Sequence, residues 1–344
     1  MIRVAILGAG GSIGRQALDV VAAHPDRLAV TREARRGDDL VAVATAADVD
    51  VVLVATPGVA ALRATVAALR AGKRVALANK EVLVAAGHLI AELVPGAGDR
   101  LRPVDSEHNG LWQCLAGERM DQVARVAITA SGGAFRGRSY ASLDGVTPDE
   151  ALRHPTWKMG PKVTVDSATL VNKGYEVVET HWLYGIAYDR IDVVFHPESV
   201  VHALVEYVDG SVKAQLAEPD MRLPIQFALL WDRAPSPAPR LDLTRERDLH
   251  FGPIERGRYP CFDAVLETAR SGDLGAMIGL SAADELGVDA FLRGELGFTA
   301  IAGLLRRGAE LGAREGAGER PDLERVIEID RAVRAALAPA AVGA

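Results

Sequence analysis

The first fourteen residues constrain the fold of this chain more than any other segment. A short apolar run, Arg3–Leu7, leads into a turn with glycines at positions 8, 10, 11 and 14, and helical apolar spacing follows as far as His24. Strand, glycine turn and helix in this order open a doubly wound α/β domain. Glycines let backbone amides approach a pyrophosphate at a helix start, so the turn predicts a dinucleotide site. A tight turn without a ligand has the same pattern.

The rest of the chain divides into strand-like and helix-like segments. Asp50–Ala55 and Arg74–Ala78 are predicted strands with a helix over residues 60–71 between them, and Arg102–Asp105 looks like the end of another strand. Further along, Arg125–Ala130 and Lys162–Asp166 are predicted strands, and Leu170–Tyr184 is a predicted helix. His202–Tyr207 and Ser211–Leu216 are expected to form a hairpin, and four helices are expected beyond Pro260.

Composition narrows the functional classes. A chain of 344 residues is long enough for two or three domains, and its net charge of −7 offers no basic face for a nucleic acid. Local lysines and helix starts could still bind a phosphorylated small molecule. Cys114 and Cys261 are far apart, which predicts reduced thiols and a cytoplasmic protein. Neither a signal peptide nor an apolar run of about 20 residues is present, so we expect no membrane segment.

Polar residues follow two of the predicted strands. Lys80 comes directly after a buried strand, where open α/β sheets place ligands, although a solvated Lys-Glu pair would look the same. Asp105 and Glu107 are two apart, and in an extended segment they would face one hard cation. A single Asp-x-Glu is more often surface charge, so this interpretation needs a third ligand.

Glu176 is the candidate third ligand. Asn172 lies one helical turn before it with Lys173 alongside, so an amide, an ammonium and a carboxylate can face one pocket. Ser167 is expected at a strand-to-helix junction with its hydroxyl outward. This arrangement suits a phosphate beside a metal-bound oxygen, and an exposed polar helix face is the alternative.

Two loops add further candidates. Ser131 and the two glycines after it close a predicted strand, and their hydroxyl and amide groups could hold phosphate oxygens. The segment from His154 to Gly160 places a histidine and Trp157 between Pro and Gly, as a water-excluding lid would. A structural loop with one core tryptophan remains the alternative.

Together these segments resemble the 1-deoxy-D-xylulose 5-phosphate reductoisomerase family. The match runs from Val104 to about Gly160 and continues through Asp166–Glu179, His196–His202, Gly210–Pro224 and Arg258–Phe262. The resemblance implies a metal-dependent rearrangement of the sugar phosphate, generally described as breaking and remaking a C–C bond. A hydride from NADPH then gives 2-C-methyl-D-erythritol 4-phosphate, an isoprenoid precursor.

The resemblance also assigns roles by matched position. The implied ligands for Mg²⁺ or Mn²⁺ are Asp105, Glu107 and Glu176, which with Lys80 form the catalytic set. The implied substrate contacts are Lys80, Ser106, Glu107, Ser131, His154, Trp157, Ser167, Asn172, Lys173 and Glu176. The implied cofactor contacts are Gly8, Gly10, Gly11, Ser12, Ile13, Asn79, Glu81 and Gly160.

The implied architecture is α/β, with an abridged Rossmann-like N-terminal domain, a central α/β catalytic domain and a C-terminal helical bundle. The expected boundaries are 1–104 for the cofactor domain, 105–232 for the catalytic and dimerisation domain with a lid at 153–161, 233–257 for a linker, and 258–344 for the bundle. The family is dimeric through its central sheet, so we expect a homodimer.

The cofactor domain departs from the family. Only residues 15–49 separate Gly14 from Asp50, which is room for one βαβ unit of ~30 residues rather than two. The predicted strand Leu28–Val30 runs directly into a basic stretch. Arg32, Arg35 and Arg36 could serve as a 2′-phosphate site, but a solvated basic stretch is the preferred interpretation.

Other positions differ as well. Ala9-Gly10 replaces Ser-Thr in the turn, Val54–Pro57 replaces an Asn-Ala-Ile-Val pattern, and Asp284 stands where the family has Asn. Two functions therefore remain open: a working reductoisomerase, or a descendant that keeps the metal and sugar-phosphate site and has lost or changed its use of the nicotinamide cofactor.

Overall fold

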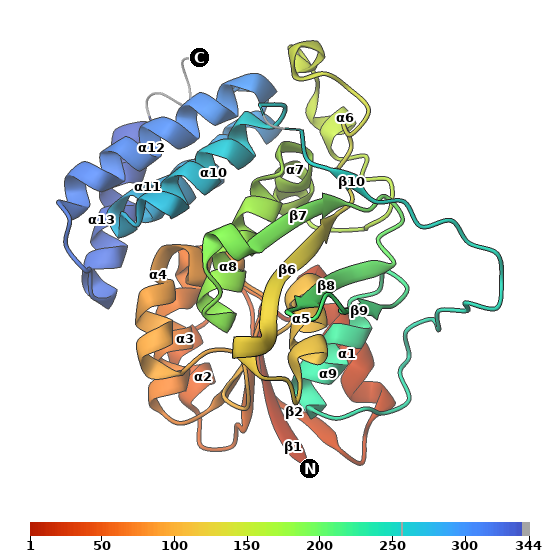
Figure 1. Ribbon diagram of the computed structural model, residues 1–344. Coiled ribbons are helices and arrows are strands. Elements are labelled where there is room, and N and C mark those ends of the chain that lie inside the picture. Colours follow the sequence, from red (N-terminus) through yellow and green to blue (C-terminus); the bar gives the residue numbers. More distant parts are fainter. Residues whose placement is uncertain (256, 339–344) are drawn as a thin grey trace.

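The computed structural model describes residues 1–255 and 257–338. Residue 256 of the predicted linker and the last six residues of the predicted bundle lie outside this description. Figure 1 shows an N-terminal sheet, a second sheet beside it, and a group of helices from the C-terminal part. The predicted fold class, α/β with a Rossmann-like N-terminal region and a helical C-terminal region, is confirmed. No helix among the described residues is both long and apolar enough to cross a membrane.

The N-terminal sheet is parallel throughout. Its five strands lie in the order β2-β1-β3-β4-β5, and their bounds are Leu28–Ala34, Ile2–Leu7, Val51–Val54, Arg74–Leu77 and Leu101–Pro103. All four residues of β3 are buried, as expected for a central strand covered on both faces. The predicted strands at 50–55 and 74–78 are confirmed.

Helices from distant parts of the chain cover the two faces of this sheet. Val4 and Ile6 of β1 pack with α1 (Ser12–Ala23) and α9 (Arg222–Leu230). Ala5 and Leu7 belong to the other face, which α2 (Leu40–Thr45), α3 (Leu62–Arg70) and α4 (Lys80–Leu93) cover. This alternation is the period of two expected of a strand, and Figure 1 shows the two helix groups on opposite sides.

The first part of the basic stretch belongs to the second strand, and Arg35 and Arg36 follow its end. β2 extends to Ala34, four residues beyond the predicted end at Val30, and its ladder pairs Ala34 with Leu7. The prediction ended the strand too early because charged residues disfavour a buried strand. β2 is an edge strand, however, so the side chains of Arg32 and Glu33 reach solvent while Ala34 is buried. The six-residue helix α2 then leads to β3.

The second sheet has the order β10-β7-β6-β8-β9. The bounds of its strands are Gly252–Pro253, Ile191–Phe195, Val123–Ala130, Val201–Tyr207 and Val212–Leu216. β6 and β7 are parallel, the other pairs are antiparallel, and the predicted β8–β9 hairpin is confirmed. One face packs on α5 (Ser106–Leu115) and α8 (Val171–Tyr184) through Leu111, Val126 and Val177.

The predicted strand Lys162–Asp166 is wrong. These residues belong to the helix α7 (Pro161–Thr169), which a short helix α6 (Pro148–Ala151) precedes in the chain. Alternating valines favoured a strand, but Pro161 at the first helical position starts a helix. Leu170, with a φ of 60°, then separates α7 from α8. Ser167 therefore lies in the last turn of α7 and not at a strand-to-helix junction.

The C-terminal part is helical, as predicted. After a long loop without helix or strand at residues 231–251 (Figure 1), β10 joins the second sheet and four helices follow. They are α10 (Pro260–Ser271), α11 (Leu274–Leu292), α12 (Ile301–Gly316) and α13 (Leu323–Leu337). Glycines bring the backbones of α11 and α12 into contact: a Cβ on Gly312 would lie 2.1 Å from the carbonyl oxygen of Gly275.

This contact predicts opposite effects for two substitutions on α12. Gly312→Ala should lower the free energy of unfolding by about 2–3 kcal/mol, because the new methyl group overlaps the α11 backbone. Gly303→Ala has open space around its Cβ and should raise the free energy of unfolding by up to about 1 kcal/mol through helix propensity. Urea denaturation measures both. Equal effects would contradict the close helix contact.

Candidate active site

A cavity of about 510 Å³ lies where the carboxyl ends of the N-terminal strands meet the second sheet and its loops. This is the position where open α/β sheets hold ligands, and the volume suits a small ligand. Every residue predicted for substrate or metal lines it, together with three of the residues predicted for the cofactor. The predicted residues that line it are Ser12, Ile13, Lys80, Asp105, Ser106, Glu107, Ser131, His154, Trp157, Gly160, Ser167, Asn172, Lys173 and Glu176.

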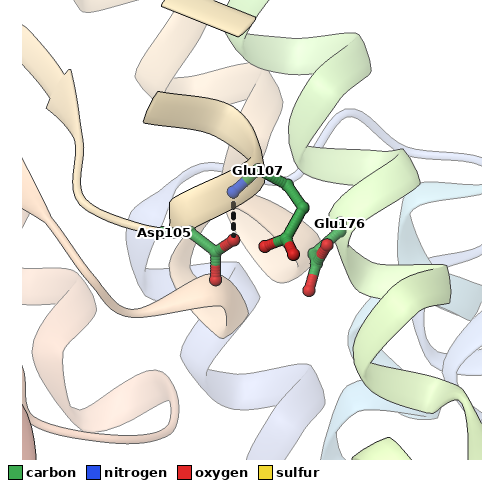
Figure 2. A group of neighbouring side chains, drawn as sticks. All are labelled: Asp105, Glu107 and Glu176. Atoms are coloured by element: carbon green, nitrogen blue, oxygen red, sulfur yellow. Dashed lines mark hydrogen bonds between the residues drawn. The ribbon is translucent and has the colours of Figure 1, made fainter. Parts of the chain in front are cut away.

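Three carboxyl groups converge inside the cavity. Oxygen atoms of Asp105, Glu107 and Glu176 all lie within 4.8 Å of one another (Figure 2). The predicted extended geometry of the first two is wrong: Asp105 is the N-cap of α5, and its Oδ1 accepts a hydrogen bond from the Glu107 amide at 3.4 Å. An acidic residue at the cap and another in the first turn both favour a helix here.

Two lysines compensate these carboxyl groups. Lys80 forms an ion pair with Asp105 and lies 3.8 Å from Glu176, and Lys173 pairs with Glu176 and lies 3.5 Å from Glu107. Burial alone would raise the pKa of Glu107, but the positive charges around it, above all Lys173, hold the pKa at about 2. Burial would lower the pKa of Lys173, yet Glu107 and Glu176 raise it. Two ammonium groups thus face three carboxyl groups.

Hydrogen bonds fix the orientation of the acidic side chains. The Asn172 amide donates to Glu176 Oε1 at 2.6 Å, and the Ser106 hydroxyl donates to Glu107 Oε2 at 2.8 Å. His108 of α5 connects this helix to α8, because its Nε2 is 2.9 Å from the Glu176 carbonyl oxygen. Its Nδ1 is 3.4 Å from Asp105 Oδ1. The oxygens therefore point at a common centre, as hard divalent cations require.

The predicted lid is anchored by His154. Its Nδ1 accepts hydrogen bonds from the amides of Thr156 and Trp157, at 3.1 and 2.9 Å. Burial lowers the pKa of His154 to about 4, so the ring is neutral at pH 7. The ring proton is then on Nε2, which donates to the Ser131 hydroxyl at 3.0 Å. The lid and the loop after β6 are thereby joined above the cavity.

Two glycines of the turn, Gly8 and Gly14, have no room for a side chain. A Cβ on Gly8, which has a φ of 91°, would lie 2.8 Å from the Ala55 carbonyl oxygen, and a Cβ on Gly14 would lie 2.4 Å from the Gly8 carbonyl oxygen. This close packing keeps the start of α1 directed at the cavity, where Ser12 and Ile13 line the wall. Such a turn fits a pyrophosphate at a helix N-terminus.

Five of the predicted cofactor residues do not line the cavity: Gly8, Gly10, Gly11, Asn79 and Glu81. Asn79 caps α4, where its Oδ1 accepts a hydrogen bond from the Val82 amide at 2.8 Å. Glu81 is buried and pairs with Lys162 instead.

Several lining residues had not been assigned from the sequence. Lys158 belongs to the predicted lid, and the Pro- and Gly-bounded loop that indicated Met159 as a lid residue was a signal that could have identified it. Ser199 and Met221 come from loops near the second sheet, and only folding brings them to the wall. His108 stood inside the acidic motif, but its bridging contacts depend on α8, sixty-eight residues away.

Family models match most of the chain. Residues 101–184 match the 1-deoxy-D-xylulose 5-phosphate reductoisomerase C-terminal domain, and residues 216–336 match the DXP reductoisomerase C-terminal domain. Residues 4–36 and 31–87 match the model described as 1-deoxy-D-xylulose 5-phosphate reductoisomerase in two overlapping pieces. The overlap falls on the basic stretch at the end of β2, where the cofactor region is short.

Two similar curated proteins carry the same name, 1-deoxy-D-xylulose 5-phosphate reductoisomerase. The protein of Thermomicrobium roseum is 44% identical over 370 residues, covering 96% of this chain and 95% of the relative. That of Geobacillus kaustophilus is 43% identical over 376 residues, covering 96% and 97%. Both alignments are longer than this chain of 344 residues, so the relatives carry extra residues within the matched region.

Solved structures agree along the full length. A DOX-P reductoisomerase in complex with NADPH, fosmidomycin and magnesium superposes with a TM-score of 0.92 at 33% identity, covering 99% of this chain and 98% of that one. The 1-deoxy-D-xylulose 5-phosphate reductoisomerase from Zymomonas mobilis in complex with NADPH gives 0.86 at 35% identity, covering 99% of both chains.

The carboxylate geometry makes a prediction that needs no turnover assay. Glu176→Gln should weaken Mn²⁺ binding by at least about tenfold, because a neutral amide replaces a charged hard ligand. Titration calorimetry with Mn²⁺ measures this affinity. Glu206→Gln, on the face of β8 that points away from α5 and α8, is the control and should bind as the wild type does. Equal affinity in all three proteins would mean that the cation binds elsewhere.

Proposed function

The chain belongs to the 1-deoxy-D-xylulose 5-phosphate reductoisomerase family, and we propose that it is a working enzyme of that family. It converts 1-deoxy-D-xylulose 5-phosphate to 2-C-methyl-D-erythritol 4-phosphate by a metal-dependent rearrangement and reduction by NADPH, in isoprenoid-precursor biosynthesis. The observation that carries the proposal is the convergence of Asp105, Glu107 and Glu176, with two lysines, at the base of one cavity.

The donor set fits Mg²⁺ or Mn²⁺. Three carboxyl groups, no thiol and no imidazole among them, are the ligands of a hard cation. A cation held there supplies Lewis-acid stabilisation of negative charge on substrate oxygens. Asp105, Glu107 and Glu176 are the residues that would hold it. Its positive charge would offset the excess of carboxyl groups over ammonium groups at the site.

The surrounding residues would bind and orient the sugar phosphate. Lys173 and Asn172 face the carboxyl groups from α8, and Ser131 and Ser167 line the wall beside them. Together they offer an ammonium, an amide and two hydroxyls to a phosphate dianion. Lys80, which pairs with Asp105 at the same centre, can polarise or orient a sugar oxygen.

The lid would exclude water from the bound substrate. Trp157 lines the cavity, and its ring centroid is 6.2 Å from that of the buried His202. Because His154 holds the lid backbone through two amide hydrogen bonds, the indole is placed over the sugar site in a fixed orientation. A closed, dry cavity strengthens every charged contact inside it.

NADPH is the cofactor of the proposed reaction, and the glycine turn suits its pyrophosphate because Gly8 and Gly14 let the backbone pack closely at the start of α1, which borders the cavity. Ser12, Ile13 and Gly160 line the adjoining wall. Arg32 is paired with Asp48. Arg35 is paired with Glu33. Arg36 follows the end of β2, beside the turn, where it could reach a 2′-phosphate.

The alternative of a descendant that has lost the cofactor is not favoured. Relatives of the same name align with 96% of this chain, including its shortened first region, and the parallel sheet is complete around the glycine turn. The two matches to the family model overlap at residues 31–36, at the end of the edge strand β2, and none of these residues lines the cavity.

A homodimer through the second sheet is part of the proposal. On the face away from α5 and α8, Ala127, Leu204 and Ala214 lie side by side on β6, β8 and β9. Apolar residues in such a row are typical of a sheet that packs against another surface. We place the enzyme in the cytoplasm because both cysteines, Cys114 and Cys261, are unpaired and buried.

The direct test is turnover. Purified protein with Mg²⁺ or Mn²⁺ should oxidise NADPH when 1-deoxy-D-xylulose 5-phosphate is added, and should do so faster than with NADH. Chelation of the metal with EDTA should abolish the reaction, since the carboxyl groups alone cannot stabilise charge on the substrate. The absorbance of NADPH at 340 nm follows the reaction. Binding of substrate and metal without NADPH oxidation would support the descendant instead.

A further inference from the structure

A second group of buried charges lies behind the cavity and away from the proposed metal ligands. The ammonium of Lys162, near the start of α7, is 2.9 Å from Glu81 Oε1, 2.6 Å from Asp166 Oδ2 and 2.8 Å from Asp284 Oδ2. A lysine has three N–H donors, so these three acceptors use all of them. The carboxyl groups are almost fully buried, whereas 22% of the Lys162 side chain is exposed.

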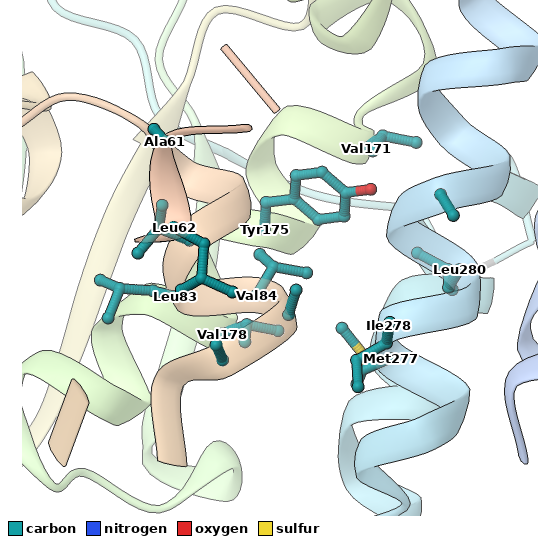
Figure 3. Packing of buried hydrophobic residues seen from close by; sticks show 14 of the residues in the cluster. Ala61, Leu62, Leu83, Val84, Val171, Tyr175, Val178, Met277, Ile278 and Leu280 are labelled. Atoms are coloured by element: carbon teal, nitrogen blue, oxygen red, sulfur yellow. The ribbon is translucent and has the colours of Figure 1, made fainter. Parts of the chain in front are cut away.

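The group joins four helices. Glu81 belongs to α4, Lys162 and Asp166 to α7, and Asp284 to α11. Tyr175 of α8 completes it, because its hydroxyl donates to Asp284 Oδ2 at 3.1 Å and its ring centroid is 5.1 Å from the Lys162 ammonium. Figure 3 shows the Tyr175 ring projecting from α8 toward α11, with Leu83 and Val84 of α4 close by.

Each member on α4, α7 and α8 is the sequence neighbour of a residue that lines the cavity. Glu81 follows Lys80, Lys162 precedes Val163, Asp166 precedes Ser167, and Tyr175 precedes Glu176. In each of these pairs, therefore, one residue lines the cavity, and its sequence neighbour belongs to the group around Lys162. Asp284 alone comes from outside the wall, and it ties the group to the C-terminal helices.

We propose that Lys162 is a positioning residue for the reaction. By binding three carboxyl groups at once it fixes the spacing of the helix ends that carry Lys80, Ser167 and Glu176. The proposal rests on the proposed function for what these three residues do. Lys162 itself does not touch the substrate; it acts through the backbone of the segments that do.

The charge pattern argues for geometry over stability. One cation faces three acids, and a buried ion pair is on average no more stabilising than apolar side chains of the same volume. Burial and the neighbouring Asp284 raise the pKa of Asp166 well above its usual value, and burial raises that of Asp284. Burial would also raise the pKa of Glu81, but Lys162 outweighs it. What the arrangement does supply is a fixed geometry, because one ammonium group holds carboxyl groups from three helices.

The test replaces Lys162 with arginine. Lys162→Arg keeps the positive charge, so activity should be retained if Lys162 serves only as a counter-ion. A planar guanidinium, however, cannot reproduce the arrangement in which one ammonium group contacts three carboxyl groups. We expect kcat to fall at least about tenfold with a smaller change in KM, because small displacements of catalytic groups are costly. The melting temperature should stay within about 3 °C of the wild type.

Lys73→Arg is the matched control. Lys73 is also partly buried and donates to the carbonyl oxygens of Ala46 and Val49, but it lies before β4, at the opposite end of that strand from the cavity. Its kcat should match that of the wild type. A kcat for Lys162→Arg within about twofold of the wild type would overturn the proposal. Such a difference corresponds to less than about 0.5 kcal/mol in the activation free energy.

A second measurement does not depend on turnover. Hydrogen exchange of the α4 segment 80–86 should be faster in Lys162→Arg, and in Lys162→Met/Asp284→Asn, than in the wild type. The double variant loses the cation together with one acid, so it guards against misfolding from uncompensated charge. Unchanged exchange in the folded variants would overturn the proposal. If the wild type shows no turnover, the proposed function fails, and exchange alone decides the role of Lys162.

Discussion

The mutual repulsion of three carboxyl groups in one buried place is the constraint on which the rest of this structure depends. Asp105, Glu107 and Glu176 could not stay within 4.8 Å of one another without compensation. Lys80 and Lys173 provide it from two different helices. The site therefore exists only when α4, α5 and α8 are correctly placed together, and the fold holds these three helices in that arrangement.

A continuous apolar core provides this placement. Residues of the N-terminal sheet, of α4 and α8, and of the C-terminal helices belong to one buried cluster, part of which Figure 3 shows. On the other face of the sheet, α9 returns from the catalytic region to pack with α1. The three parts are therefore one packed body around the cavity, and β2, after which the chain is short, is an edge strand of the N-terminal sheet.

Much of the site could be predicted from the sequence, because its residues occur in short motifs whose chemistry is specific. Local conformation was less predictable. Asp105 and Glu107 lie at a helix start, although they follow a predicted strand end and were expected to be extended. Lys162–Asp166 is part of a helix, although its alternating valines favoured a strand. Packing against neighbouring helices overrides such local preference. The junction at Lys162 could not be foreseen at all, since it joins residues as distant in the chain as 81 and 284.

The central claim, that these carboxyl groups enclose a divalent cation beside a sugar-phosphate pocket, is tested most directly by anomalous diffraction from crystals soaked in Mn²⁺. The account predicts one strong anomalous peak at bonding distance, about 2.0–2.3 Å, from oxygens of Asp105, Glu107 and Glu176. Both lysine ammonium groups should have turned away from those oxygens. A strong peak elsewhere, or none with the ion pairs of Lys80 and Lys173 intact, would contradict it.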